Sequence, residues 1–127
     1  MTLTASNVPK YKVLIVDDEK PIRDIIGRYL ANKGFEVLEA GSGEEALKYF
    51  QIEKPHIVLL DINMPGLSGL ETLSRLKKIS PECKIIMITA LWDEEMFKKC
   101  SDLGAIYYIV KPIELQYLDA LIFGKLL

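Results

Sequence analysis

The sequence has few residues of the kinds that bind soft metals, with only two cysteines and one histidine among its 127 residues. One histidine cannot form a zinc site, and Cys83 and Cys100 lack the spacing of metal ligands. Cys100 falls on the apolar face of an expected helix, which predicts a small core residue. His56 comes just before an expected strand, which predicts a loop residue. Thiols used in this way fit a reducing cytoplasm, where we expect the protein to reside.

The sequence also lacks long hydrophobic runs and any cluster of basic residues. Apolar runs such as residues 13–16 and 57–60 are about four residues long, whereas a membrane-spanning helix needs about 18 or more. Residues 1–10 are polar without an apolar core, so they predict a flexible N-terminal arm and no secretory signal. Lysine and arginine are scattered, and the formal net charge is −2. We therefore expect neither a membrane nor a nucleic acid as a partner.

What the sequence does contain is a regular alternation of strand and helix patterns. Half of its residues are hydrophobic, and its length is typical of one domain, which we expect over residues 11–127. Apolar runs predict five strands, at residues 12–16, 35–39, 57–61, 84–89 and 106–110. Strands that alternate with helices predict an α/β fold, with a parallel sheet covered by helices on both faces.

The helices show individual start, stop and burial signals. The first helix begins at Pro21 and ends at Gly34, and the residues expected on its apolar face are Ile22, Ile25, Ile26, Tyr29 and Leu30. Ser42 and Glu45 form a capping-box pattern at the start of the second helix. The fourth helix is expected over residues 93–103, and the residues expected to face the core are Met96, Phe97, Cys100 and Leu103. The last helix follows Lys111-Pro112 and continues to the C-terminus.

Reactive side chains stand at the carboxyl ends of four of the five expected strands. Asp17 and Asp18 follow the first strand, Asp61 ends the third, Thr89 ends the fourth and Lys111 follows the fifth. In a parallel sheet these ends share one edge, where open α/β sheets place their ligands. Close carboxylates repel and raise each other's pKa unless a cation intervenes, and carboxylate oxygens suit Mg²⁺. The pattern predicts a magnesium site in which one aspartate attacks phosphorus.

In this order and at these positions, the residues resemble the receiver domain of bacterial response regulators, the phosphate-accepting half of two-component signalling. The resemblance covers about residues 11–126. It includes the acidic pair, Asp61 with residues 63–66 (Asn-Met-Pro-Gly), Thr89-Ala90 and Lys111-Pro112. It implies a flavodoxin-like doubly wound fold with strand order 2-1-3-4-5, and a domain that catalyses only its own phosphorylation and dephosphorylation.

The resemblance also implies a role for each site residue. Asp61 accepts the phosphoryl group from a sensor histidine kinase or a histidine phosphotransfer protein, and Thr89 and Lys111 contact the phosphate. The ligands it implies for Mg²⁺ are Asp17, Asp18, Asp61 and the Asn63 carbonyl. The bond before Pro112 is expected to be cis. Tyr108 matches the aromatic switch of the family, which changes rotamer when Thr89 moves toward the phosphate.

Three other functions fit parts of the pattern. Residues 41–46 resemble a dinucleotide fingerprint, but they follow the second strand and two acids crowd the helix start, so capping explains them better. A flavodoxin would need hydroxyl or glycine donors in its first loop, where this chain has residues 17–20 (Asp-Asp-Glu-Lys). An aspartyl-nucleophile phosphatase also uses Mg²⁺, Asp, Thr and Lys, but it places the nucleophile on the first strand. This phosphatase remains the alternative function.

Phosphorylation is expected to repack the surface formed by the fourth helix, the fifth strand and the fifth helix, which would contact a downstream effector. Trp92 beside the switch is either an interaction anchor or a packing residue. Leu91 lies where the family controls access of water, which indicates slow hydrolysis of the phosphate. The last helix has an inward stripe of Leu115, Leu118 and Ile122 that omits Tyr117 and Phe123. Such leftover apolar residues, Leu126 and Leu127 included, predict a partner surface or a homodimer.

A departure from the family pattern follows Gly104-Ala105, where many DNA-binding regulators carry an acidic pair. Here Ile106 and Tyr107 occupy those positions, so the charged dimer contacts of that subfamily are not expected. Whether the chain is a stand-alone receiver or part of a longer regulator stays open.

Overall fold

The computed structural model of the chain describes residues 11–126, with side chains through residue 124. The expected arm at residues 1–10 and the side chains of Leu126 and Leu127 lie outside the described residues. The strands are β1 (Lys12–Val16), β2 (Glu36–Ala40), β3 (Ile57–Asp61), β4 (Lys84–Thr89) and β5 (Tyr107–Val110). The helices are α1 (Lys20–Asn32), α2 (Gly43–Glu53), α3 (Gly69–Ile79), α4 (Glu94–Asp102) and α5 (Leu115–Leu121), which continues as the π-helical turn η2 (Ile122–Leu126).

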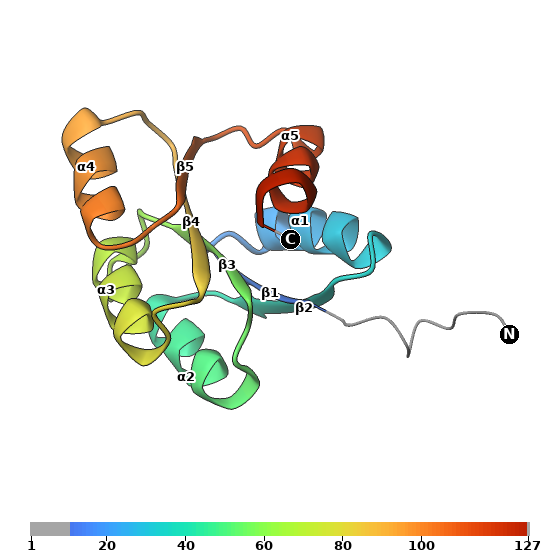
Figure 1. Cartoon of the computed structure of the whole chain (residues 1–127), viewed down its shortest axis with the longest axis horizontal. Coiled ribbons are helices and arrows are strands. Elements are labelled where there is room, and N and C mark those ends of the chain that lie inside the picture. The colour runs from blue at the N-terminus through green and yellow to red at the C-terminus, as the bar shows by residue number, and fades with distance from the viewer. Residues whose placement is uncertain (1–10, 127) are drawn as a thin grey trace, which may run out of the picture.

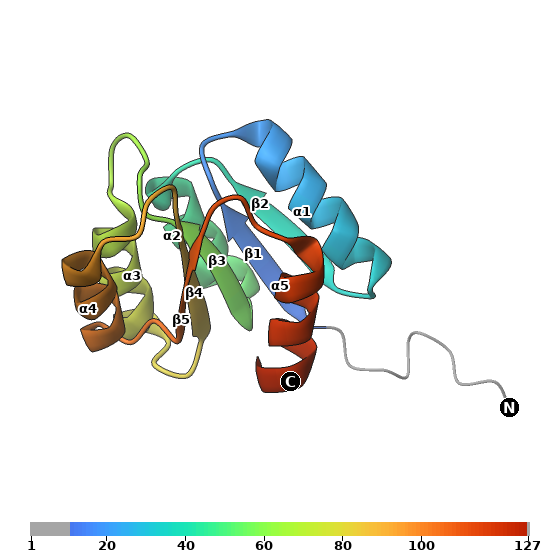
Figure 2. The ribbon, with the colours of Figure 1, turned by 90° about the horizontal axis from the view of Figure 1, so that it is seen from above.

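The five strands form one parallel sheet in the order β2-β1-β3-β4-β5, which confirms the predicted fold. Helices α1 and α5 cover one face, while α2, α3 and α4 cover the other (Figures 1 and 2). The register aligns Val16 with Leu60 and Asp61 with Ile88. The carboxyl ends of β1, β3 and β4 therefore lie side by side, which brings the predicted site residues to one edge.

Burial explains why the central strands have continuous apolar runs. Every residue of β3 is buried, as are all residues of β1 and β4 except the first of each. Two apolar cores result, one on each face of the sheet. The edge strand β2 is only half-buried over most of its length and carries Glu36 and Glu39, and such charges are typical of edge strands.

Strand β2 begins one residue later than the sequence predicted. Phe35 was expected to open it, but the Phe35 N–H donates a hydrogen bond to the Leu30 carbonyl, 3.2 Å away. Gly34 has φ +101°, a left-handed conformation that ends helix α1 at low steric cost. Phe35 therefore belongs to the turn that ends α1, although its side chain is buried in the core.

Two helices bury fewer residues than the sequence predicted. Cys100 is buried in α4 as expected, but Phe97 and Leu103 are 40% and 37% exposed. Helix α4 covers the sheet at β4 and β5 (Figure 1). Because β5 is the edge strand, the apolar face of α4 has little of the sheet to pack against. In α1, Ile25 is also exposed although Ile26 and Leu30 are buried.

Smaller expectations are confirmed. Ser42 caps α2 by accepting a hydrogen bond from the Glu45 N–H, 3.1 Å away. His56 is an exposed loop residue whose Nδ1 accepts a hydrogen bond from the Lys12 N–H at 3.0 Å. Tyr117 and Phe123 stay largely exposed beside the buried stripe of α5.

Among residues 11–126, no helix combines the length and the apolar character needed to cross a bilayer.

Candidate functional site

Four side chains converge at the carboxyl edge of the sheet. Asp17, Asp61 and Thr89 are each at most 4% exposed. The Lys111 Nζ lies 3.1 Å from Asp17 Oδ2 and 3.6 Å from Asp61 Oδ2. The Lys111 backbone N–H donates to the Thr89 carbonyl at 2.7 Å, which joins the end of β5 to the end of β4. Asp17 and Asp61 therefore share a single ammonium group, and the backbone contact places Thr89 at the same edge of the sheet.

Asp61 is a buried carboxylate next to another carboxylate. Burial raises the pKa of Asp61, and the charge of Asp17 raises it further. Two contacts oppose this rise in pKa: the Asn63 N–H donates to Asp61 Oδ1 at 3.1 Å, and Lys111 supplies positive charge. The Asn63 N–H thus holds Asp61 in one orientation, and a further positive charge nearby would stabilise its ionised form.

Lys111 responds to the same surroundings in the opposite sense. Burial alone would lower the pKa of Lys111, but the hydrogen bond to Asp17 and the charge of Asp61 outweigh it and raise the pKa. Lys111 is therefore a fixed cation at neutral pH. The peptide bond that follows it, Lys111–Pro112, is cis.

The turn after β1 presents three acids. Carboxylate oxygens of Asp17, Asp18 and Glu19 lie within 4.8 Å of one another, with Asp17 buried and the other two exposed. The Glu19 N–H donates to Asp17 Oδ1 at 2.9 Å, and the Asp17 N–H donates to the Ala40 carbonyl at 3.1 Å. Hard oxygen donors that are partly buried and partly open to solvent fit Mg²⁺, which keeps several waters when it binds. Glu19 was not among the predicted ligands, and it stands beside them.

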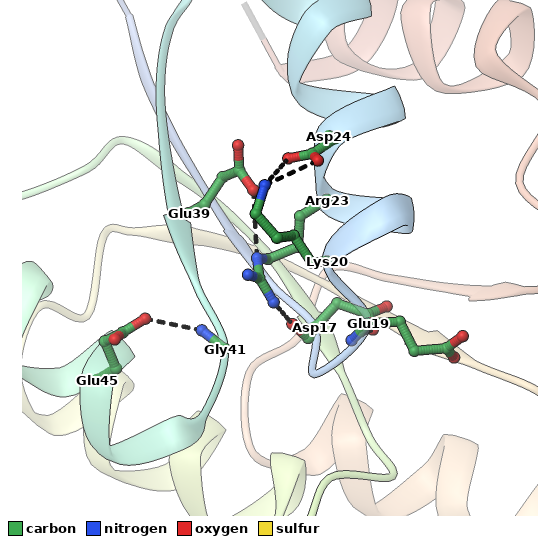
Figure 3. Close-up of polar contacts among 8 residues, drawn as sticks. All are labelled: Asp17, Glu19, Lys20, Arg23, Asp24, Glu39, Gly41 and Glu45. Carbon is green, nitrogen blue, oxygen red and sulfur yellow. Dashed lines mark hydrogen bonds and ion pairs between the residues drawn. The ribbon is translucent and has the colours of Figure 1, made fainter.

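Two residues that the sequence reasoning missed hold this cluster in place. Arg23 donates from Nη1 to the Asp17 carbonyl and from Nε to Glu39 on β2 (Figure 3). Gly69 begins α3 against the backbone of Asp61 and Ile62, so closely that a Cβ there would overlap both. Arg23 stands six residues beyond Asp17, and Gly69 follows the N-cap Ser68. In the sequence, only these positions relative to Asp17 and Ser68 could have indicated that the two residues support the site.

Thr89 lies next to a group of three aromatic rings, one from β5, one from α4 and one from the loop before α4. The rings of Trp92 and Phe97 meet the Tyr108 ring edge to face, with centroids 5.5 Å and 5.6 Å away. Trp92 also contacts Phe97, yet it remains 58% exposed. Trp92 therefore packs on its neighbours and still offers a face to solvent, and a role as an interaction anchor stays a prediction.

The hydroxyl of Tyr108 is buried and has no hydrogen-bond partner of good geometry within the described part of the chain. Burial raises the pKa of Tyr108, although the Thr89 side chain lies close enough to oppose this rise. An unpaired buried hydroxyl costs about 1–3 kcal/mol, so Tyr108→Phe is expected to raise the free energy of unfolding by about 1 kcal/mol. Urea unfolding measures this, with the exposed Tyr117→Phe as a control expected to change by less than about 0.5 kcal/mol. A less stable Tyr108→Phe protein would show that the hydroxyl has a partner.

Comparison with known proteins gives a consistent result. A family model described as the response regulator receiver domain matches residues 13–123. The sporulation initiation phosphotransferase F of Bacillus subtilis is 35% identical over 105 residues, covering 83% of this chain and 85% of that protein. A cyclic di-GMP phosphodiesterase of Thermotoga maritima is 40% identical over 106 residues, covering 84% of this chain. The chain spans only 28% of that phosphodiesterase.

Solved structures agree with the sequence matches. A CheY-like receiver domain protein from Methanospirillum hungatei superimposes with a TM-score of 0.89 at 33% identity, covering 93% of this chain and 94% of that one. CheY in a CheX-CheY-BeF3-Mg complex from Borrelia burgdorferi gives a TM-score of 0.88 at 30% identity, covering 96% and 92%.

Proposed function

This chain belongs to the family of response regulator receiver domains, and on that premise we propose that Asp61 accepts a phosphoryl group from a phosphohistidine. The chain is thus the receiver domain of a two-component response regulator. The observation that carries the proposal is the position of Asp61, a buried carboxylate with the Lys111 Nζ 3.6 Å from Oδ2. No structural need of the fold accounts for two buried carboxylates and an ammonium group at one sheet edge.

The transfer requires one bond to form and one to break. An oxygen of Asp61 attacks phosphorus, and the phosphorus–nitrogen bond of phosphohistidine breaks. The electron pair of that bond returns to the imidazole, which leaves neutral because its other nitrogen carries a proton. Lys111 neutralises the charge that is spread over the phosphoryl oxygens in a loose transition state. The Thr89 hydroxyl donates a hydrogen bond to the same oxygens once the phosphoryl group is in place.

The residues that would hold Mg²⁺ are Asp17, Asp18, Asp61 and the Asn63 carbonyl. When bound, the ion supplies the positive charge that offsets the carboxylates and lets an anionic phosphoryl group approach. The closeness of the acidic oxygens and the raised pKa of Asp61 support this role. The CheX-CheY-BeF3-Mg complex from Borrelia burgdorferi is consistent with it.

The pKa of Asp61 predicts how stability depends on pH. When the pKa of a carboxyl group is higher in the folded than in the unfolded state, folding favours its protonated form. The protein then loses stability as the pH rises above the pKa of that group in the unfolded state, which is about 4. We expect metal-free protein to be more stable near pH 5 than near pH 7. Asp24, whose pKa is lowered by its hydrogen bond to Lys20, acts in the opposite sense but only below about pH 4.

Thermal unfolding at the two pH values, with EDTA or with Mg²⁺, measures this difference. At a concentration a hundred times its Kd, Mg²⁺ is expected to add about 2.7 kcal/mol and to remove most of the dependence on pH. Asp61→Asn should show a weaker dependence in EDTA. An equal dependence in Asp61→Asn would mean that another group causes it.

We propose that phosphorylation draws Thr89 toward the phosphate and changes the packing of Tyr108. The structure places the Tyr108 hydroxyl in a buried position, and the predicted change of rotamer stays part of this proposal. Trp92, the only tryptophan, touches the Tyr108 ring. Its fluorescence should change with beryllium fluoride and Mg²⁺, and not in Asp61→Asn. A change that persists in that variant would refute the switch.

The partners follow from the phosphoryl chemistry. A sensor histidine kinase or a histidine phosphotransfer protein donates the group, and the surface of α4, β5 and α5 contacts a downstream effector or a second copy of the chain. We propose a domain over residues 11–127 after an arm at residues 1–10, located in the cytoplasm, where Cys83 and Cys100 remain free thiols. Leu91, 76% exposed beside Thr89, favours slow hydrolysis of the phosphate.

One experiment separates this function from that of an aspartyl-nucleophile phosphatase. A receiver should take up a single phosphoryl group from acetyl phosphate and then stop, because it catalyses only its own modification. Release of phosphate from p-nitrophenyl phosphate, followed over many equivalents, measures turnover. Sustained turnover that Asp61→Asn abolishes would favour the phosphatase and contradict the proposal.

A further inference from the structure

We propose that Arg23 is a positioning residue that fixes the turn carrying the acidic residues after β1 and so sets the affinity for Mg²⁺. This inference rests on the metal role in the proposed function. It concerns a residue whose side chain bonds to the backbone carbonyl of Asp17 and, within the described part of the chain, forms no hydrogen bond or ion pair with the carboxylates proposed to bind the metal.

The contacts of Arg23 join three elements. Its Nη1 donates to the Asp17 carbonyl at 2.6 Å, and its Nε donates to Glu39 Oε1 at 3.2 Å. Figure 3 shows the guanidinium reaching from α1 between the turn and strand β2. The Arg23 side chain is 14% exposed. A mostly buried charge with two specific partners differs from a solvated surface arginine.

The space for the guanidinium depends on a glycine. A Cβ on Gly41 would lie 3.3 Å from Arg23 Nη1, closer than most such contacts, and at an ordinary 3.9 Å from its Cζ. Gly41 follows β2, and the residue before it, Ala40, accepts the Asp17 N–H. Strand β2 therefore leaves room for Arg23 at the same place where it holds the backbone of Asp17.

With Arg23 included, each polar atom of Asp17 has a partner. The N–H bonds to Ala40, the carbonyl to Arg23, Oδ1 to the Glu19 N–H and Oδ2 to Lys111. Mg²⁺ demands near-ideal octahedral geometry, so small displacements of its ligands weaken binding. Partners that orient metal ligands typically contribute 10–100-fold in metal affinity. The planar guanidinium fits two acceptors at fixed angles, which a lysine ammonium does not reproduce.

A simple charge effect of Arg23 predicts the opposite result. A cation near a cation site weakens binding, so its removal should tighten Mg²⁺ binding if charge alone mattered. Glu39 already compensates the charge of Arg23, since the two side chains form an ion pair. Positioning therefore predicts weaker binding in Arg23→Gln, whereas charge alone predicts tighter binding.

Calorimetric titration of Mg²⁺ into the full chain separates these outcomes. We expect Arg23→Gln and Arg23→Lys to weaken binding about 10–100-fold. Arg28→Gln, which removes the same charge from an exposed position on α1, should bind like the wild type. Tighter or unchanged binding in Arg23→Gln overturns the inference. A wild-type chain that binds no Mg²⁺ overturns the metal role, and this inference with it.

Amide exchange in the metal-free protein gives a second readout that is independent of the metal. In Arg23→Gln the Glu19 amide, which bonds to Asp17 Oδ1, should exchange faster, while core amides of β3 keep their protection. Equal exchange at Glu19 in both proteins overturns the inference. Loss of protection throughout β3 would assign the effect to global destabilisation and overturn it too.

Discussion

Replacing Lys111 with methionine is expected to slow phosphorylation by acetyl phosphate about 10²–10³-fold. Charged donors aimed at developing negative charge contribute on this scale in enzymes. The Lys111 Nζ reaches both Asp17 and Asp61, and among the described residues no other ammonium or guanidinium forms an ion pair with either carboxylate. Methionine keeps the length of the side chain and removes only the charge and the donors.

The same substitution should lower stability in the absence of metal. Without Lys111, two buried carboxylates lose their counter-charge, at a cost of about 1–3 kcal/mol for a pair that solvent partly reaches. The loss should be smaller near pH 5, where Asp61 takes up a proton more readily. Intact mass spectrometry over time gives the rate, and Lys78→Met, an exposed lysine on α3, is the control. Phosphorylation at the wild-type rate would remove Lys111 from the mechanism.

Replacing Gly69 with alanine is expected to destabilise the fold by about 1–3 kcal/mol. The new Cβ would lie 2.6 Å from the Ile62 Cα and would also overlap the carbonyl oxygen of Asp61. Both are backbone atoms that cannot turn aside, and the Gly69 N–H already donates to the Ile62 carbonyl at 3.1 Å. Overpacking of this kind costs about 1–3 kcal/mol and occasionally more.

Because the atoms that the new Cβ would displace belong to Asp61 and Ile62, we expect Gly69→Ala to lower both the free energy of unfolding and the rate of phosphorylation. Urea unfolding measures the first effect, with Gly124→Ala as the control, since nothing lies within 4 Å of a Cβ there. Because Gly124 lies in the helical turn η2, that control should be as stable as the wild type or up to about 1 kcal/mol more stable. Unchanged stability in Gly69→Ala would show that α3 does not pack against Asp61 as described.

The order of elements and the convergence of the site were predictable from the sequence because both follow from local pattern. Short apolar runs mark strands buried on both faces, and the polar residue that ends each run marks the common edge. Asp61 and Lys111 are far apart in sequence, yet the parallel arrangement alone predicts that they meet. The polar side chains at four strand ends therefore allow the site to be predicted from the sequence.

What the sequence could not predict depends on contacts between elements. The pairing of Arg23 with Glu39 requires α1 to lie across β2, and no spacing rule relates a helix to a strand edge. The exposure of Phe97 depends on how little of the sheet lies beneath α4. The buried hydroxyl of Tyr108 depends on two ring neighbours from α4 and the loop before it. Periodicity shows the apolar face of an element but not how well a neighbour covers it.

The mass of the intact chain after incubation with acetyl phosphate and Mg²⁺ tests the central claim most directly. We predict the addition of one phosphoryl group to the wild type, stable in acid and labile in base, on the peptide that contains Asp61. Asp61→Asn should remain unmodified under the same conditions. A phosphoryl group that persists in Asp61→Asn, or that maps to another peptide, would contradict the account.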